Sequence, residues 1–332
     1  MSSYLITARK GQGKGFTSDP GPVQFLRLPE TDAVYDKSHV VPVKTWVAEV
    51  RGLADGDLNP VSISPAGDVL IFVHGYNNDI AAVVDRTRAL DRNLRASGWR
   101  GVVVGFDWPS ANSVLNYIED RRDAASVAGA LVARGVRLLA EGQRAGCVTN
   151  VHLLGHSTGA YVILEAFAAA EKEGALFKSD WRVGQVALIG ADIAADSLGA
   201  GAAWSAPLMR RAMRVTNYSN GADAVLAVSN AKRLGVSARA GRVGLPAGAQ
   251  AKAVNVDCTG HFRALAPAPG AGMAWCHGWH FDDPRFGLDL ALTLEGALDR
   301  HAIPGRVLGP RGLELGVEAA RPAGMALWGI KA

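Results

Sequence analysis

The stretch VHLLGHSTGAYVILEAF, residues 151–167, places one serine between two glycines where an apolar strand gives way to a helix. So tight a turn forces its central residue into strained backbone angles, and the neighbours of that residue must lack bulk. Gly155 and Gly159 meet this requirement. We expect Ser157 to project above a sheet at the amino end of a helix, in the G-x-S-x-G arrangement of a nucleophile. A serine that only caps the helix is the alternative.

Strand and helix patterns alternate on both sides of this turn. A continuous apolar run of the buried-strand type occupies residues 68–75, and further strand patterns follow at 101–109, 148–155, 183–192, 213–220 and 251–258. Helical spacing of apolar residues is present over 78–97, 114–143, 158–173, 222–234 and 284–300. Because such alternation specifies a mostly parallel sheet with helices on both faces, the sequence predicts an α/β fold.

The ends of the chain depart from this pattern. Short β-branched or aromatic segments, SYLITAR at 3–9, PVQFLRLP at 22–29 and TWVAEVR at 45–51, predict antiparallel strands at one edge of the sheet. Only 193–211 separates two central strands, which leaves room for a short helix but not for a lid domain. We therefore expect one domain over residues 1–303 without a large lid. Residues 304–332 are rich in Gly and Pro and are expected to form a peripheral C-terminal extension.

Composition excludes several classes of protein. The 332 residues are 48% hydrophobic and carry a net charge of +4, with basic residues scattered among acidic ones, so no nucleic-acid interface is predicted. No segment has the length of a secretory core or a membrane span, so we expect a cytoplasmic protein without a transmembrane segment. The cysteines indicate neither a disulfide framework nor a zinc knuckle, because Cys147, Cys258 and Cys276 are odd in number and lack paired spacing.

Three motifs carry a resemblance to a known family. FVHGYNND lies at 72–79, DWPS at 107–110 and LLGHSTG at 153–159. With these motifs the chain resembles the α/β-hydrolase superfamily, and within it the bacterial alpha/beta hydrolases of unknown function that carry FVHGYNN, WPS and GHS. The resemblance covers most of the chain. It implies the α/β-hydrolase fold, with antiparallel N-terminal edge strands, and serine hydrolase chemistry.

The resemblance also implies an oxyanion hole formed by the backbone N–H groups of Tyr76 and Thr158. Two such donors stabilise the negative charge that develops when a serine attacks an acyl carbonyl. His74, which precedes a glycine in this motif, is interpreted as a brace of the loop rather than as a base. Asn77 and Asn78 are expected to stabilise the turn, with Asn78 as the cap of the following helix.

A nucleophilic serine needs a carboxylate and a histidine, which follow it in that order in this fold. Asp223 comes after the strand at 213–219, where the resemblance puts the acid. Asp192, at the end of the preceding strand, is the alternative. A carboxylate that caps the helix beginning near 224 is a second interpretation of Asp223.

Three histidines are candidates for the base: His261, His277 and His280. The phrase HGWHFDDP at 277–284 is similar to a family phrase in which a histidine precedes a proline and a leucine-rich helix, which favours His277. His280 and His261 remain alternatives. No acidic or sulfur ligands accompany His277 and His280, so no metal site or other cofactor is predicted.

These residues predict a serine hydrolase that cleaves carboxylic esters through an acyl-enzyme intermediate. Aromatic residues near the strand ends favour a neutral, apolar small-molecule ester; they are Tyr76, Trp108, Trp204, Trp275 and Trp279. Amidase, peptidase and thioesterase activities use the same triad and remain alternatives, as does a catalytically silent binding protein of the same fold. The sequence does not predict an oligomeric state.

Overall fold

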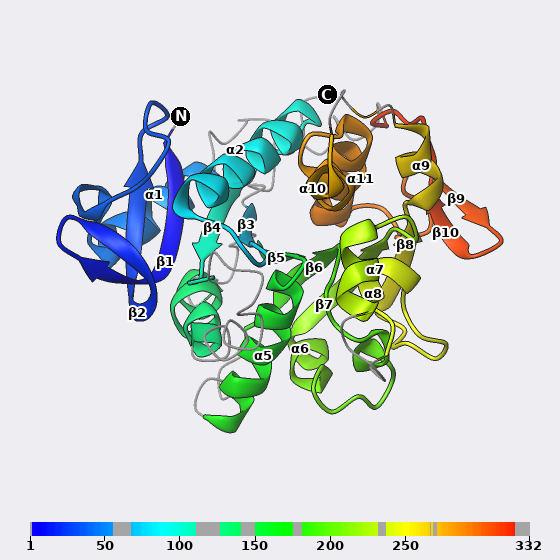
Figure 1. Cartoon of the computed structure of the whole chain (residues 1–332), viewed down its shortest axis with the longest axis horizontal. Helices are drawn as coiled ribbons and strands as arrows, with labels where there is room; N and C mark the ends of the chain where they lie inside the picture. Colours follow the sequence, from blue (N-terminus) through cyan, green and yellow to red (C-terminus); the bar gives the residue numbers. More distant parts are fainter. Residues whose placement is uncertain are drawn as a thin grey trace.

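A ten-stranded mixed sheet organises the chain in the computed structural model (Figure 1). The structure describes residues 2–55, 68–110, 127–140, 150–174, 181–231, 237–265, 267 and 271–322. In spatial order the strands are β2 (Gly15–Leu28), β1 (Ser3–Gln12), β4 (Val102–Asp107), β3 (Asp68–Val73), β5 (Asn150–His156), β6 (Val183–Ile189), β7 (Ala212–Ser219), β8 (Ala253–Asp257), β10 (Gly312–Leu315) and β9 (Arg306–Gly309).

From β1 to β10 neighbouring strands run parallel, whereas β2 and β9 pair with their neighbours in the antiparallel sense. The apolar runs of the sequence form the centre of this sheet because parallel strands are covered on both faces. Every residue of β4 is buried, as are residues 69–73 of β3. The prediction of an α/β fold with a mostly parallel sheet is confirmed.

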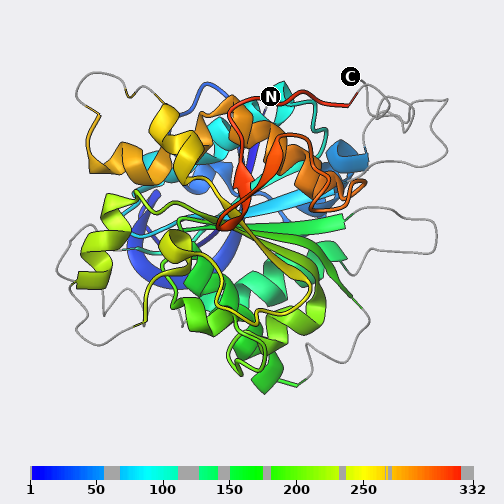
Figure 2. The ribbon, with the colours of Figure 1, turned by 90° about the vertical axis from the view of Figure 1, so that its right-hand side faces the viewer.

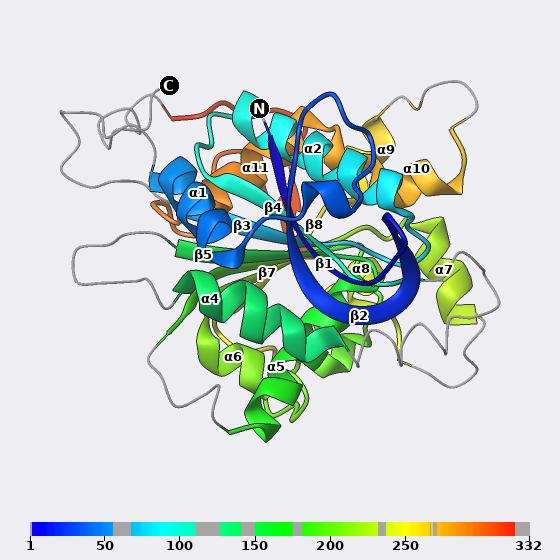
Figure 3. The same cartoon turned by 90° about the vertical axis from the view of Figure 1, so that its left-hand side faces the viewer.

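Helices cover both faces of the sheet. Their bounds are α1 (Val43–Asp55), α2 (Ile80–Ala96), α4 (Arg137–Ala140), α5 (Gly159–Lys172), α6 (Ala206–Arg211), α7 (Ala224–Ala231), α8 (Ala240–Val243), α9 (Thr259–Ala264), α10 (Met273–Gly278) and α11 (Pro284–Glu295). One core cluster joins α1, α5 and α6 to the sheet, and another joins α2, α9 and α11 to the opposite face. Figures 2 and 3 show α10 and α11 on one side of the strands and α5 and α6 on the other.

At the N-terminus β1 and β2 form an antiparallel hairpin, as predicted, with Ile6 opposite Phe25. The prediction of a third strand from TWVAEVR is wrong, because these residues lie in the helix α1. Trp46, Val50 and Ala54 recur at intervals of four, which places them on one helical face, and all three are buried in the core.

At the C-terminal side the final helix is shorter than the predicted 284–300. It ends at Glu295 because Gly296 adopts a left-handed conformation, with φ 66°, that closes the helix. Residues 306–315 of the expected extension form β9 and β10, and β10 pairs with β8. The side chain of Arg306 is wholly buried and contacts both carboxylate oxygens of Asp289, which ties this hairpin to α11.

The predicted helix over 114–143 is described only from 127 to 140, where a π-helical segment, Leu131–Val136, leads into α4. The remainder of that helix and Cys147 lie outside the described residues. Within the described part of the chain, none of the helices combines the length and the apolar character that crossing a bilayer requires.

Candidate active site

Ser157 occupies a sharp turn between β5 and α5. Its φ is 55°, a left-handed conformation that costs an L-residue about 1–2 kcal/mol. The backbone N–H of Ser157 donates to the carbonyl of Ile189 at the end of β6, at 3.0 Å, which holds the turn against the neighbouring strand. The residue is 9% exposed. A strained serine held at the carboxyl edge of a parallel sheet has the geometry that the sequence motif predicts.

The two flanking glycines allow the close approach that this turn needs. A Cβ atom on Gly159 would lie 2.1 Å from the carbonyl oxygen of Val73 in β3. A Cβ atom on Gly155 would lie 2.9 Å from the backbone nitrogen of Ala160 in α5. Both distances are shorter than any carbon contact can be, so larger residues at these positions would push the turn away from β3 and α5.

The loop after β3 lies directly against this serine. A Cβ atom on Gly75 would come within 2.7 Å of the Cβ of Ser157. His74 Nδ1 donates to the Gly75 carbonyl at 2.7 Å, and Asn78 Nδ2 donates to the same carbonyl at 2.8 Å. Asn77 has φ 54°, so the loop turns sharply after Gly75. Two side chains of the loop thus hold its backbone at Gly75, where the loop contacts Ser157.

The two predicted oxyanion donors flank this contact. Tyr76 follows Gly75 in the loop, and Thr158 follows Ser157 and immediately precedes α5. The first N–H groups of a helix lack partners within the helix and point along its axis toward negative charge. The structure therefore brings both predicted donors to the neighbourhood of Ser157.

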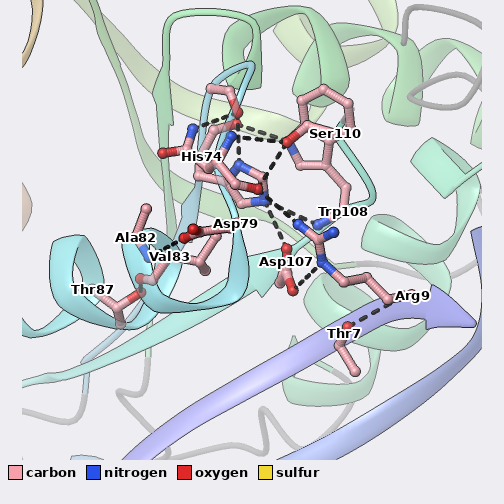
Figure 4. A network of polar contacts seen from close by, with 12 residues as sticks. Thr7, Arg9, His74, Asp79, Ala82, Val83, Thr87, Asp107, Trp108 and Ser110 are labelled. Atoms are coloured by element: carbon pink, nitrogen blue, oxygen red, sulfur yellow. Dashed lines mark hydrogen bonds and ion pairs between the residues drawn. The ribbon is translucent and has the colours of Figure 1, made fainter. Parts of the chain in front are cut away.

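His74 is wholly buried and braces the loop (Figure 4). Its Nε2 lies 2.9 Å from Asp107 Oδ1, and its ring stacks on Trp108 with an interplanar angle of 9°. With Nδ1 engaged by the Gly75 carbonyl, both ring nitrogens have protein partners. The cap of α2 is Asp79, whose carboxylate accepts from Ala82 N at 2.8 Å, so the prediction of Asn78 as the cap is wrong.

Sequence analysis missed the buried ion pair of Arg9 and Asp107, the aspartate that contacts His74. Arg9 Nε donates to Asp107 Oδ2 at 2.7 Å, and the hydroxyl of Tyr35 contacts the same oxygen. Burial raises the pKa of Asp107, but Arg9 and His74 outweigh this effect and lower the pKa to about 2. The available signal was a lone aspartate that ends a wholly apolar strand, since a buried carboxylate requires a partner.

Asp223 and His277 contact each other. Asp223 Oδ2 lies 2.6 Å from His277 Nδ1, and the exposed fractions of the two residues are 1% and 8%. The other carboxylate oxygen accepts from Leu226 N at 2.9 Å and thereby holds the first turn of α7. Asp223 therefore makes both contacts that the sequence offered as alternatives: it pairs with a histidine and it caps the following helix.

The ring of His277 lies beside the turn that carries Ser157. A Cβ atom on Gly190, directly after β6, would lie 2.9 Å from His277 Cε1, and His156 Nε2 donates to the His277 carbonyl at 3.0 Å. Burial, together with the nearby His277, lowers the pKa of His156 well below its usual value, so His156 carries no charge at neutral pH. His277 Nε2 is buried and makes no hydrogen bond to the described residues.

Asp192, the alternative acid, has a different setting. Its Oδ1 lies 3.1 Å from Nε of Arg239, and both side chains are buried. Its backbone N–H donates to the carbonyl of Ser157 at 3.1 Å. Asp192 therefore contacts the backbone of the Ser157 turn, whereas Asp223 contacts His277.

The two alternative histidines also lie in other surroundings. His261 Nε2 lies 3.0 Å from Asp283 Oδ1, and the same oxygen caps α11. His280 stacks on Trp279 at 4.1 Å between ring centroids, and neither of its nitrogens has a hydrogen-bond partner among the described residues. Burial, reinforced by the nearby His277, lowers the pKa of His280 well below its usual value.

The aromatic residues of the expected pocket make packing contacts. Trp108 is wholly buried and donates from Nε1 to the His74 carbonyl at 2.8 Å. Trp204 Nε1 donates to Glu165 at 2.9 Å, and Trp275 and Trp279 pack on Phe262. Across the described residues, no group of three or more His, Cys, Asp or Glu side chains is arranged to hold a metal ion.

Comparison with known proteins identifies a family. The family model described as "Alpha/beta hydrolase of unknown function (DUF900)" matches residues 55–256. No curated protein matches the chain. Among solved structures, an esterase of Pyrobaculum calidifontis is 14% identical, with 69% of this chain and 76% of that chain covered and a TM-score of 0.37. The carboxylesterase EstE1 from a metagenomic library is 15% identical, with coverage of 70% and 80% and a TM-score of 0.38.

Proposed function

The chain belongs to the family of alpha/beta hydrolases of unknown function, and from this premise we propose that it is a serine hydrolase that cleaves carboxylic esters. The observation that carries the proposal is the strained Ser157 at the β5–α5 turn, with the Asp223–His277 pair beside the same turn. A serine, a carboxylate and a histidine in this chain order are the groups that acyl transfer in this fold uses.

In the proposed mechanism each group has one task. His277 Nε2 accepts the hydroxyl proton as Ser157 Oγ attacks the ester carbonyl. Asp223, 2.6 Å from His277 Nδ1, keeps the proton on that nitrogen and stabilises the imidazolium ion. The N–H groups of Tyr76 and Thr158 bind the oxyanion, and each such donor contributes about 3 kcal/mol to catalysis.

Collapse of the tetrahedral intermediate breaks the ester C–O bond, and the leaving alcohol takes the proton from His277. Water then attacks the acyl-enzyme with His277 as base, and Ser157 recovers its proton as the carboxylic acid leaves. This cycle requires no metal and no organic cofactor. The proposed substrate is a neutral, apolar ester of a small molecule, and we place the protein in the cytoplasm.

The test is hydrolysis of p-nitrophenyl esters from acetate to palmitate by the parent and by four variants, Ser157→Ala, His261→Ala, His277→Ala and His280→Ala. We expect kcat to fall by about 10⁶-fold in the Ser157 and His277 variants. The His261 and His280 variants, corrected for their folded fraction, should keep the parent kcat. Activity that survives Ser157→Ala would contradict the mechanism.

A fluorophosphonate probe separates a silent fold from a narrow specificity. Labelling of the parent at Ser157 without ester hydrolysis means that the site is active on another acyl compound. Thioesters and anilides then test the thioesterase and amidase alternatives. A parent that is neither labelled nor active refutes the proposed function, and markedly better turnover of a charged thioester than of aryl esters refutes the proposed substrate class.

A further inference from the structure

The direction of the Tyr76 N–H follows from the groups that hold the preceding carbonyl. The described residues contain no cis peptide bond, so the C=O of Gly75 and the N–H of Tyr76 point in opposite directions across one planar peptide. His74 Nδ1 and Asn78 Nδ2 both donate to the Gly75 carbonyl, at 2.7 Å and 2.8 Å. Whatever fixes these two donors therefore also fixes the direction of the N–H.

Asp107 fixes the first donor. Its Oδ1 lies 2.9 Å from His74 Nε2, on the side of the ring opposite the nitrogen that holds Gly75. The carboxylate is wholly buried at the end of β4 (Figure 4). A carboxylate without solvent keeps its position and its charge only if a buried cation accompanies it.

Arg9 of β1 is that cation, and it contacts both this carboxylate and the backbone of the loop after β3. Its Nε donates to Asp107 Oδ2 at 2.7 Å, and its Nη2 donates to the carbonyl of Asn78 at 2.9 Å. Arg9 is 3% exposed. One guanidinium thus holds the carboxylate behind His74 and also the backbone of the second donor, Asn78. Arg9 lies outside residues 55–256, the segment that matches the family model.

We propose that Arg9 is a positioning residue of the oxyanion hole, which acts through Asp107, His74 and Asn78 on the Gly75–Tyr76 peptide. This inference rests on the proposed function. Its consequence is specific to the transition state, because an oxyanion donor that is displaced by a fraction of an ångström weakens binding of the developing charge while the ground-state ester still binds.

The test compares Arg9→Gln and Arg9→Lys with the parent and with Arg27→Gln. Arg27 is the matched control: it lies on the same hairpin, and its guanidinium pairs with Glu49 at a half-exposed surface. The first readout is the second-order rate of fluorophosphonate labelling at Ser157, which needs no known substrate. The second, with an active ester, is the division of the effect between kcat and KM together with the Ki of a trifluoromethyl ketone, which forms an oxyanion in the site.

For Arg9→Gln we expect labelling and kcat to fall by about 10-fold to 100-fold, corrected for the folded fraction, with KM within about 2-fold of the parent. The Ki of the ketone should rise by the same factor as kcat falls. Arg9→Lys, which can make only one of the two contacts, should lie between parent and Arg9→Gln. Arg27→Gln should match the parent.

Several outcomes would overturn the inference while leaving the proposed function intact. Parent-like labelling and kcat in folded Arg9→Gln would do so, as would a loss confined to KM or to thermal stability. If Arg9→Gln does not fold, the labelling rate of Arg9→Lys becomes the test. A rate below that of the parent supports the positioning role, and a parent-like rate contradicts it. Absence of both labelling at Ser157 and ester hydrolysis in the parent would instead refute the proposed function itself.

Discussion

Asp223 contacts His277 Nδ1 with one carboxylate oxygen, at 2.6 Å, and caps α7 with the other through Leu226 N, at 2.9 Å. One residue thus orients an imidazole and begins the helix that follows it. From the sequence, the acid of a triad and the cap of a helix are alternative interpretations of Asp223. In the structure Asp223 makes both contacts. Because the two contacts use different oxygens, substitutions can separate them.

Asp223→Asn should lower kcat far more than stability. An asparagine oxygen still accepts from Leu226 N, but the amide cannot hold a proton on His277 Nδ1, so kcat should fall by about 10⁴-fold. Asp223→Ala removes the cap as well and should cost about 1 kcal/mol more in unfolding free energy than Asp223→Asn. Ester hydrolysis and urea denaturation of both variants measure the two effects. Equal stability of the two variants, or a parent-like kcat in Asp223→Asn, would contradict the dual role.

Gly159→Ala should disrupt the turn, because the new Cβ would lie 2.1 Å from the Val73 carbonyl oxygen. We expect a loss of about 3 kcal/mol or more in unfolding free energy and the loss of phosphonate labelling. Gly52→Ala is the matched control, since Gly52 is an exposed helical glycine whose added Cβ meets nothing within 4 Å. That variant should be about 0.5–1 kcal/mol more stable than the parent. A stable, labelled Gly159→Ala protein would show that the close approach is not required.

His280→Phe should reduce the acid sensitivity of the fold. The pKa of His280 lies well below its usual 6.5 in the folded protein, so below pH 6.5 the unfolded chain binds a proton that the folded chain does not. The contribution of neutral, buried His280 to the unfolding free energy is fully present above pH 6.5 and is lost as the pH falls below that value. Between pH 8 and pH 5 the variant should lose about 1–2 kcal/mol less than the parent.

Urea denaturation at the two pH values measures this difference. His280→Phe should also keep the parent kcat at pH 8, because His277 is the proposed base. His156, which is also neutral and buried, keeps part of the pH dependence in both proteins. Equal loss of stability in parent and variant would show that His280 already takes up a proton in the folded state.

Asp107→Asn should change the pH dependence of stability in a more acidic range than His280→Phe does. The groups that face this carboxylate are Arg9 from β1, Tyr35 and His74, and they hold its folded pKa at about 2, below the usual 3.8. Its contribution is complete above pH 3.8 and is lost as the pH falls through 2. The stability difference between parent and Asp107→Asn should therefore narrow by about 2 kcal/mol from pH 7 to pH 2. A difference that does not vary with pH would mean that the folded pKa is not depressed.

Arg306→Met should destabilise the protein by about 3–5 kcal/mol, because it removes the cation that contacts both oxygens of the wholly buried Asp289 carboxylate and leaves only Arg285, 3.9 Å away. The double variant Arg306→Met with Asp289→Leu should recover much of that loss, since both members of the Arg306–Asp289 pair are then replaced by apolar side chains. Thermal unfolding of the two proteins is the measurement. If the double variant is no more stable than the single one, then the hydrogen bonds of Arg306 with Thr293 and Tyr218 dominate instead.

The strands of the central sheet could be predicted from sequence because most of them carry short runs of apolar, often β-branched residues, which is a local signal. α1 could not, since its β-branched and aromatic composition favours a strand while the spacing of Trp46 and Val50 favours a helix. The strands β9 and β10 were also missed. They are short, and Arg306 holds them in place through contacts that only the folded chain brings together.

For the candidate site, motifs with a fixed chain order led to Ser157, Asp223 and His277, and the structure places Asp223 against His277 across 54 positions of sequence. Their catalytic roles stay predictions. The contact between Arg9 and Asp107 spans 98 positions and belongs to no local motif. Sequence can indicate that a buried carboxylate needs a cation, but which of the chain's arginines supplies it depends on the arrangement of β1 beside β4.

The two hairpins at the ends of the sheet set a limit on how the protein can be shortened. Figure 1 shows β1–β2 at one edge and β9–β10 at the other, and both lie outside residues 55–256, the segment that matches the family model. A fragment expressed with those boundaries would expose the unpaired backbone of β4 on one side and of β8 on the other. Open parallel edges of this kind pair with other chains, so we expect such a fragment to aggregate even with Ser157, Asp223 and their loops intact.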